Sequence, residues 1–386
     1  MKPYILWLGA IFNEKQVLTS QAISPAANNW QSGLMKPIVD KRCPIIALGH
    51  KPEPIWPKGQ IKMNYQEYNF GSFINGYLAG YLNIPFIRTK NLISKYESLL
   101  KKVLKTNGNP KCVISYNPYP QNAETAMKLQ NELQIPWICI IADMPTTLSA
   151  ISKHNEYIAR CDGSIFLSWD MYKKSICEKK FHLDGGIYNM HIEPNTVNKN
   201  KPKHIILYAG SLTKWGGVNS LIEAFKLIKR EDIELWICGP GENSLVESES
   251  RANKNITFLG FLTKPKLEET YKTASIFVNP RPSSVIGNEY NFPSKLFEYL
   301  SYLKPIVSTK TPGISPEYEK VLVMSENESP IAISEKITEV LEWDESKKST
   351  QKTKTIEFLS KNKTWESQVN RLSDWLIKEF SLNLQG

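Results

Sequence analysis

The chain repeats one pattern along its length: a short apolar run of strand length, followed by a longer segment with apolar residues at helical spacing. In the first half, helical spacing appears at residues 121–134 and 171–180. Alternation of this kind is typical of a parallel sheet whose strands are joined by helical crossovers. The sequence therefore predicts an α/β fold. The apolar runs of this half are residues 4–12, 44–49, 111–116, 135–143 and 162–168.

A polar stretch with several lysines and prolines, residues 191–203, interrupts this pattern before it starts again. Because a chain of 386 residues exceeds what one core usually organises, we expect two Rossmann-like domains. The expected domains are residues 1–192 and 203–362, with a hinge in the linker near Asn195. The strands expected in the second domain are residues 204–211, 233–239, 256–260, 275–280 and 305–309.

The last segment, residues 363–386, also carries apolar residues at helical spacing. A helix with one apolar face buries that face against another element or stays amphipathic on its own. Either this helix packs back on the first domain, which we expect, or it stands alone.

Cysteine and histidine usage predicts no metal site. The six cysteines stand singly, several inside apolar runs, and the five histidines lack metal-ligand spacing. We therefore expect reduced packing cysteines and no structural zinc. The first apolar run, residues 4–12, is too short to span a bilayer and lacks the basic front of a signal peptide. These features predict a cytoplasmic protein.

The formal charge of +10 would suit an anionic membrane face or a phosphate-bearing substrate. A solvated lysine-rich surface is the alternative. We expect no nucleic-acid partner, because no helix-turn-helix, aromatic RNA platform or arginine-rich arm occurs. The aromatic run at residues 69–86 would fit a lipid-linked acceptor, with peripheral contact at the inner membrane face; alternatively it is core and sheet edge.

The most specific local motif is residues 288–307, NEYNFPSKLFEYLSYLKPIV. A Pro-Ser-Lys turn opens a short amphipathic helix, and a Lys-Pro turn leads into an apolar strand. The first amides of a helix lack internal partners and attract phosphate, while Glu298, one turn further on, can accept hydrogen bonds from a ribose diol. This motif predicts a site for a nucleotide diphosphate.

Three landmarks stand in order in the second half: the GSL…GG turn of residues 210–217, the GPG turn of residues 239–241, and FPSKLFEYLSYLKPIVS. Together they resemble family 4 retaining glycosyltransferases of the GT-B fold, in which two Rossmann-like domains face each other across a cleft. The resemblance implies a nucleotide-sugar donor, such as a UDP- or GDP-sugar, as substrate of the C-terminal domain. It further implies a glycan or lipid-linked acceptor in the N-terminal domain, transfer in the cleft with retention, no cofactor or metal, and a role in cell-surface polysaccharide synthesis.

The same resemblance carries over to single residues. The donor-binding residues that it implies are Gly210, Ser211, Gly239, Gly241, Asn291, Phe292, Pro293, Ser294, Lys295 and Glu298. Glu298 would hold the ribose hydroxyls, and the amides of Ser294 and Lys295 would face the diphosphate, whereas Phe292 and Pro293 could simply shape the turn. The catalytic residues that it implies are Asp143, Glu289, Lys214 and Arg281.

This chain departs from the family pattern at two places. Tyr290 stands where the family has a glutamate that touches the transferred sugar, so Glu289 or Asn291 could have taken that task. Ser211 stands where the family has an arginine aimed at the diphosphate. We expect Lys214 or Arg281 to supply the missing charge, unless both are ordinary surface cations. Gly217 would let the backbone approach the ligand closely; alternatively, it forms a simple tight turn.

In the first half, Asp143 ends an apolar run near the position where many family members carry a histidine. It could orient an acceptor hydroxyl or contact the donor sugar, or it could cap the next turn. The amide and aromatic side chains of residues 28–31 suit a sugar, although Trp30 and Leu34 could equally be the buried face of a helix. His182 and His191 read as surface residues.

Two other functions fit the same residues. A GT-B-shaped subunit that has lost its chemistry could bind or activate another transferase, and both Tyr290 and Ser211 favour that alternative. The intact residues around Glu298 argue against it. A nucleotide-sugar epimerase would need acidic and histidine pairs, for which the five histidines are not suggestively placed.

Overall fold

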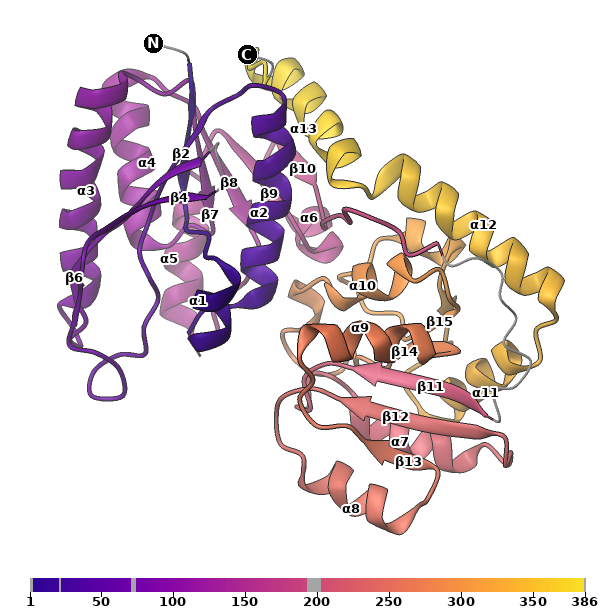
Figure 1. Cartoon of the computed structure of the whole chain (residues 1–386). Coiled ribbons are helices and arrows are strands. Elements are labelled where there is room, and N and C mark those ends of the chain that lie inside the picture. The colour runs from indigo at the N-terminus through magenta and orange to yellow at the C-terminus, as the bar shows by residue number, and fades with distance from the viewer. Residues whose placement is uncertain (1–2, 21, 71–73, 193–202, 385–386) are drawn as a thin grey trace. The chain divides into compact units, whose positions relative to one another are not determined.

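The computed structural model of the protein describes residues 3–20, 22–70, 74–192 and 203–384. Internal contacts divide the chain into two units, each built around one main sheet (Figure 1). The expected hinge near Asn195 lies outside the described residues. The first unit comprises Met1–Leu167, Met171–Gly186 and Trp365–Gly386, and the second comprises Ser168–Asp170 and Ile187–Thr364.

The boundary between the units lies at Gly186, not at residue 192 as expected. The reason is local: the Ile187 N–H donates to Lys363 O at 2.8 Å, and the Ile187 side chain is buried in a core of the second unit. The polar composition that suggested the linker therefore begins later than the change of unit.

The sheet of the first unit has eight strands in the order β10-β9-β8-β7-β1-β2-β5-β4. Its central strands are buried throughout and mostly apolar, because helices cover both faces of a parallel sheet. Neighbouring strands are parallel except for the edge pair β4 and β5, which the alternation did not predict. The strands are β1 (Ile5–Leu8), β2 (Ile45–Gly49), β4 (Gln66–Phe70), β5 (Ile74–Leu78), β7 (Cys112–Tyr116), β8 (Trp137–Ile141), β9 (Gly163–Phe166) and β10 (Lys180–His182), with β3 (Lys62–Met63) and β6 (Tyr81–Leu82) as a separate antiparallel pair.

The helices of the first unit bury the faces that their apolar spacing predicted. In α2, Ser24 caps the first turn, and Trp30 and Leu34 are buried in the core. Asn28 and Gln31 are buried too and already hold hydrogen bonds to the Phe12 backbone and to Trp7 Nε1. Trp30 and Leu34 are therefore the buried face of a helix, which was the alternative to a sugar-binding role for residues 28–31. The helices are α1 (Glu14–Thr19), α2 (Pro25–Asp40), α3 (Arg88–Asn107), α4 (Pro120–Leu133), α5 (Leu148–Ile158) and α6 (Trp169–Lys174).

The last helix, α13 (Trp365–Phe380), packs on α2 of the first unit. Trp365 meets Trp30 edge to face at 5.9 Å between ring centroids, and Leu372 is fully buried in the same core. Gln368 Nε2 also donates to Gly185 O and Asp184 Oδ1. The chain thus returns to its first unit after completing the second.

The sheet of the second unit is parallel throughout, in the order β13-β12-β11-β14-β15-β16. Every strand expected here is present within about two residues. The strands are β11 (His204–Ala209), β12 (Ile233–Cys238), β13 (Ile256–Phe258), β14 (Ile276–Asn279), β15 (Ile306–Ser308) and β16 (Val323–Met324). The helices are α7 (Val218–Leu227), α8 (Ser244–Ala252), α9 (Lys264–Thr273), α10 (Lys295–Ser301), α11 (Pro330–Leu341) and α12 (Glu345–Asn362), with 3-10 turns η1 (Asn288–Tyr290) and η2 (Pro316–Lys320).

Within the described ranges, no helix combines the length and the apolar character needed to cross a bilayer.

Candidate functional site

The carboxyl ends of β11 and β12 are packed tightly against each other. The Gly210 N–H donates to Cys238 O at 2.9 Å, and the Leu212 N–H donates to Pro240 O at 2.8 Å. Gly239 has a φ of 140°, and a Cβ there would collide with Gly210 O. Only glycine fits this position. The GPG turn, whose last residue Gly241 bridges to Leu212, therefore brings two strand ends together at the edge where open α/β sheets bind ligands.

The Lys295 ammonium occupies the space that the missing side chain of Gly210 leaves. A Cβ at Gly210 would collide with Lys295 Nζ. This nitrogen lies 4.4 Å from the ring centroid of Tyr208 and 3.4 Å from its hydroxyl oxygen. Burial and the neighbouring charge of Arg281 lower the pKa of Lys295 to about 8. Sequence reasoning assigned only the backbone amide of Lys295, whereas the structure adds its side chain to the same place.

Arg281, directly after β14, provides a second cation beside Tyr208. Its Nε donates to Asn288 Oδ1 at 2.6 Å, and the fully buried Asn288 donates in turn to Pro282 O and Trp215 O. Burial lowers the pKa of Arg281, with the Tyr208 hydroxyl opposing. The asparagine fixes the guanidinium but carries no charge to neutralise it.

Neither Lys295 nor Arg281 forms an ion pair with a carboxylate in the described part of the chain. Two desolvated like charges repel each other, and each would cost less free energy beside an anion. Their shared neighbour Tyr208 donates its hydroxyl proton to Ser211 O at 2.7 Å. The strand ends of this unit therefore carry positive charge that an anion could neutralise.

Glu298 lies on the first turn of α10 and is exposed. Its Oε2 accepts a hydrogen bond from the Tyr271 hydroxyl at 2.8 Å, and the Tyr271 ring is buried edge to face on Phe277 and Tyr299. An aromatic wall thus orients the carboxylate while leaving it accessible to a ligand. The electrostatic effect of Glu298 reaches Lys295, whose pKa it raises against the larger effect of burial.

The turn before α10 divides into structural and accessible residues. Phe292 packs on the rings of Phe297 and Tyr318, at 5.1 and 5.3 Å between centroids, and Pro293 is buried. Ser294 is exposed, and its side chain makes no capping hydrogen bond. Across the residues that the structure describes, the Ser294 and Lys295 amides have no backbone acceptor. Phe292 and Pro293 thus shape the turn, which was the alternative to a direct role in donor binding.

The two candidates for the missing sugar-contacting acid both brace their own loop. Glu289 Oε2 accepts from the Gly287 N–H at 2.8 Å, and Asn291 Nδ2 donates to Gly287 O at 2.9 Å. The Glu289 carbonyl also accepts from Ser168 Oγ at 2.8 Å. Loop 287–291 is thereby held in one shape, and Tyr290 is half-buried within it.

Lys214 is positioned differently from the other two cations. It is exposed, and its ammonium lies 5.4 Å from the ring centroid of Trp215. In the same turn Ser211 Oγ donates to Thr213 Oγ1 at 3.2 Å, and Gly217, with a φ of 75°, begins α7. This turn contributes hydroxyl groups to the strand end, whereas the buried charge comes from Lys295 and Arg281.

In the first unit, Asp143 follows β8 at the carboxyl edge of the sheet. Asn117, in a left-handed conformation with φ 58°, donates from Nδ2 to Asp143 Oδ2 at 3.0 Å and to the Tyr119 hydroxyl at 3.2 Å. Its Oδ1 accepts from the amides of Ala142 and Asp143. Desolvation raises the pKa of Asp143, and the hydrogen bond from Asn117 opposes it. Asn117, which sequence reasoning missed, organises an exposed acid and an exposed tyrosine.

A family model matches one part of the chain. Residues 190–356, which lie within the second unit, match the family Glycosyl transferases group 1. No curated protein matches the chain in sequence.

Solved structures show the fold of the whole chain. A sucrose-phosphate synthase from Thermosynechococcus elongatus is similar at a TM-score of 0.70 and 12% identity, with 98% of this chain and 99% of that one covered. Anabaena HepE in complex with UDP reaches 0.70 at 11%, covering 97% and 100%. The catalytic domain of starch synthase IV from Arabidopsis thaliana, bound to ADP and acarbose, reaches 0.68 at 10%, covering 99% and 100%. The fold is GT-B, and with the family match the protein is a glycosyltransferase of the GT-B type.

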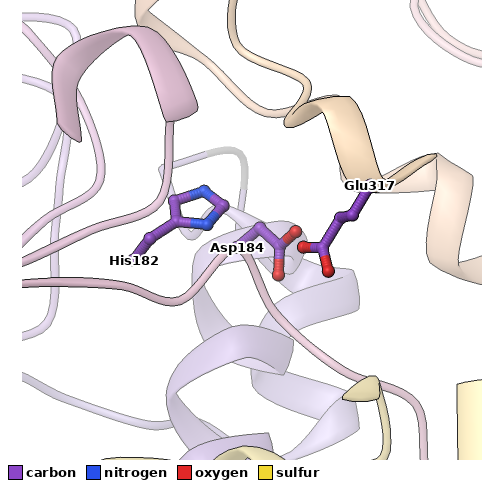
Figure 2. A group of neighbouring side chains, drawn as sticks. All are labelled: His182, Asp184 and Glu317. Atoms are coloured by element: carbon purple, nitrogen blue, oxygen red, sulfur yellow. The ribbon is translucent and has the colours of Figure 1, made fainter. Parts of the chain in front are cut away.

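A histidine and an aspartate lie at the end of β10 and just after it in this glycosyltransferase. His182 and Asp184, labelled in Figure 2, are both buried, and the His182 ring is tilted on Tyr172 at 5.7 Å. The expectation that His182 lies on the surface is wrong, because its side chain is buried and its ring packs against Tyr172. His191 is exposed as expected and stacks on Tyr302 at 4.2 Å. Glu317, also drawn in Figure 2, belongs to the second unit and accepts from Lys363 Nζ at 2.9 Å.

Proposed function

We propose that this glycosyltransferase moves a hexosyl group, with retention, from a nucleotide-sugar such as a UDP- or GDP-sugar to a glycan or lipid-linked saccharide. Its place would be cell-surface polysaccharide synthesis, in the cytoplasm and peripheral at the inner membrane face. The observation that carries the proposal is the pair of desolvated cations, Lys295 and Arg281, without a carboxylate partner and close to an exposed acid.

A nucleotide diphosphate suits each part of this site. The two cations offset the charge of the pyrophosphate, and the amides of Ser294 and Lys295 add donors at the start of α10. Glu298, oriented by Tyr271, accepts hydrogen bonds from the ribose hydroxyls. The turn at residues 239–241 would line the base or ribose. Structures of similar fold are described as complexes with UDP and ADP, which supports this choice of ligand.

The chemistry follows from the positions of the charges. Departure of the diphosphate places negative charge next to Lys295 and Arg281, which stabilise it without a metal ion. In the retaining mechanism that we propose, the leaving diphosphate takes the acceptor's proton on the same face of the sugar, and no protein nucleophile forms a covalent intermediate. Catalysis then consists of positioning and of stabilising an oxocarbenium-like sugar.

For the acceptor, we assign the polar edge of the first unit. Asp143, held by Asn117, presents a carboxylate that can orient a hydroxyl group, and the exposed Tyr119 ring offers an apolar face to a sugar. Four hydrogen bonds of the Asn117 side chain offset the conformational free energy of its left-handed backbone. Backbone strain of this kind is typical of functional sites.

Thermal unfolding with UDP, GDP, ADP and their nucleosides tests the donor site. At least one nucleoside diphosphate should raise the melting temperature, whereas its nucleoside should do so weakly, because the cations bind the pyrophosphate. Glu298→Ala should remove most of the shift. The matched control Glu231→Ala, at an exposed loop position before β12, should keep it.

The results separate the alternatives. If no nucleoside diphosphate stabilises the protein, the donor assignment fails. If one does but no nucleotide-sugar is hydrolysed or consumed with any acceptor, the protein is the non-catalytic binding subunit that the Tyr290 departure favours. A shift that survives in Glu298→Ala would remove Glu298 from the site.

A further inference from the structure

Several exposed apolar side chains belong to residues in and next to β3 and β6 of the first unit; β6 is labelled in Figure 1. Their exposure is unusual for residues of this size in one short stretch of a folded unit. We define the docking surface as residues 54–62 together with residues 81–90. Its exposed apolar members are Ile55, Trp56, Ile61, Leu82, Phe86 and Ile87.

The docking surface is a single braced element. Asn83 is fully buried, and its side chain donates to Pro54 O at 2.7 Å and to Gln60 O at 2.8 Å. Its backbone accepts from the Trp56 N–H and donates to Ile61 O. These bonds hold the two segments together, so their exposed apolar side chains belong to one braced element.

Phe86 is the most exposed large apolar residue of the patch. Its side chain is 99% exposed, and its φ is 66°, a region that aromatic residues rarely adopt. The Ile87 N–H donates to Pro85 O at 2.9 Å, which closes a tight γ-turn of the rare, strained kind around Phe86. No core packing explains a phenyl ring held outward by strained backbone, and such strain often marks a functional position.

The charges around the patch are almost all positive. Five basic residues lie on it or at its edge, against the single acid Glu53, whose Oε1 accepts from the Gln60 N–H. The ammonium groups of the four lysines form no ion pair with any residue that the structure describes. These basic residues are Lys51, Lys58, Lys62, Arg88 and Lys90.

We propose that the docking surface binds an anionic lipid bilayer, with Phe86 and Trp56 inserted at headgroup level. Aromatic side chains favour the membrane interface, and lysines on the same surface reach anionic headgroups. A second copy of the chain would bring the same positive charge to the patch and is disfavoured for that reason. The inference rests on the proposed function in one respect: it gives the lipid-linked acceptor a physical place, on the first unit.

The proposal also revises the sequence expectation for residues 69–86. Residues 69–70, 74–78 and 81–82 of that run are strand, with Ile74 and Leu78 of β5 and Tyr81 of β6 buried. Among the described residues of the run, the large apolar ones that are exposed, Leu82 and Phe86, lie near its end, next to residues 55–61, which the sequence did not connect with them. The membrane-facing group is therefore assembled by the fold.

Co-sedimentation with phosphatidylcholine vesicles, with and without phosphatidylglycerol, tests the surface. The protein should bind only the anionic vesicles, and added salt should weaken binding. Phe86→Asn should lower the partition coefficient by about tenfold through loss of the ring, and Lys58→Glu with Lys62→Glu by about tenfold or more. Because asparagine accepts positive φ readily, Phe86→Asn should also not lower the melting temperature.

Matched controls are Ile176→Ser, at an exposed isoleucine outside the docking surface, and Lys352→Glu with Lys354→Glu on α12. Both controls should bind vesicles like the original protein. Failure to bind anionic vesicles, equal binding by the Phe86→Asn variant, or equal losses in the controls would overturn the proposal. Nucleotide-induced stabilisation, measured on the same samples, should persist in Phe86→Asn, so failure of the docking surface is distinguishable from failure of the donor site.

Discussion

The carboxyl ends of the parallel strands in the two sheets carry side chains of opposite charge. At the second sheet, Lys295 and Arg281 are half-buried, desolvated cations without a carboxylate partner among the described residues. At the first, Asp143 is an acid held by the uncharged amide of Asn117, with no cation paired to it among the described residues. Neither edge neutralises its own charge.

This difference shows how one architecture can serve two ligands. Helices and strands bring side chains to the carboxyl edge in both units, but the side chains placed there decide the sign of the field. A cationic edge suits a diphosphate, whereas an acid beside an exposed tyrosine suits a hydroxylated sugar. Substitutions at the two edges test this contrast.

Removal of the buried ammonium should have the largest effect. Lys295→Met should weaken UDP binding, or that of the preferred nucleoside diphosphate, by about 100-fold, because charge-assisted bonds to the pyrophosphate are lost. Uridine binding should change little. The unliganded variant should melt at a higher temperature, since a desolvated cation repelled by Arg281 is gone. Calorimetric titration measures the first two effects, and the control Lys254→Met, at an exposed lysine, should match the original protein.

Neutralising the acid of the first unit should affect turnover but not donor binding. Asp143→Asn keeps the size of the side chain and the hydrogen bond from Asn117, so we expect the transfer rate to fall by about 30-fold through poorer positioning of the acceptor. The dissociation constant of the nucleotide should stay unchanged. Asp40→Asn, at the exposed end of α2, is the control. A variant that loses nucleotide affinity instead would place Asp143 with the donor sugar.

The pH dependence of nucleotide binding should follow Lys295. Its pKa is lowered to about 8, so the unliganded protein loses this positive charge as the pH rises through that value. Because the diphosphate binds the protonated form, affinity should decrease toward about tenfold per pH unit above 8, and binding should take up a proton. Calorimetry in two buffers of different ionisation enthalpy measures that uptake. Lys295→Met should show none, and an unchanged affinity above the pKa would exclude this lysine from the site.

The smallest effect is expected at the exposed lysine of the glycine turn. Lys214→Ala removes a cation that lies over Trp215 in solvent, so nucleotide affinity should fall by about threefold at most. A loss as large as that of Lys295→Met would mean that Lys214 leaves Trp215 and reaches the diphosphate when ligand binds. Titration of both variants under identical salt decides between them.

The sequence predicted the strands of the second sheet more completely than those of the first. In the second unit, each apolar run became a strand, and Glu298 lies on the first turn of α10, as the motif indicated. In the first unit, the antiparallel edge pair β4 and β5 was missed. An edge strand buries only one side and carries polar residues such as Glu67, so its apolar signal is weak.

The alternation of strands and helices, its restart in the second half and the local motif that contains Glu298 could all be predicted from the amino-acid sequence. These are properties of neighbouring residues, set by periodicity and turn chemistry. The folded chain was needed to show that the Lys295 side chain fills the space at Gly210, that Asn117 holds Asp143, and that the segments of Phe86 and Trp56 are joined. Such pairings join residues far apart in the chain, and side-chain direction and burial, which one sequence does not show, decide them.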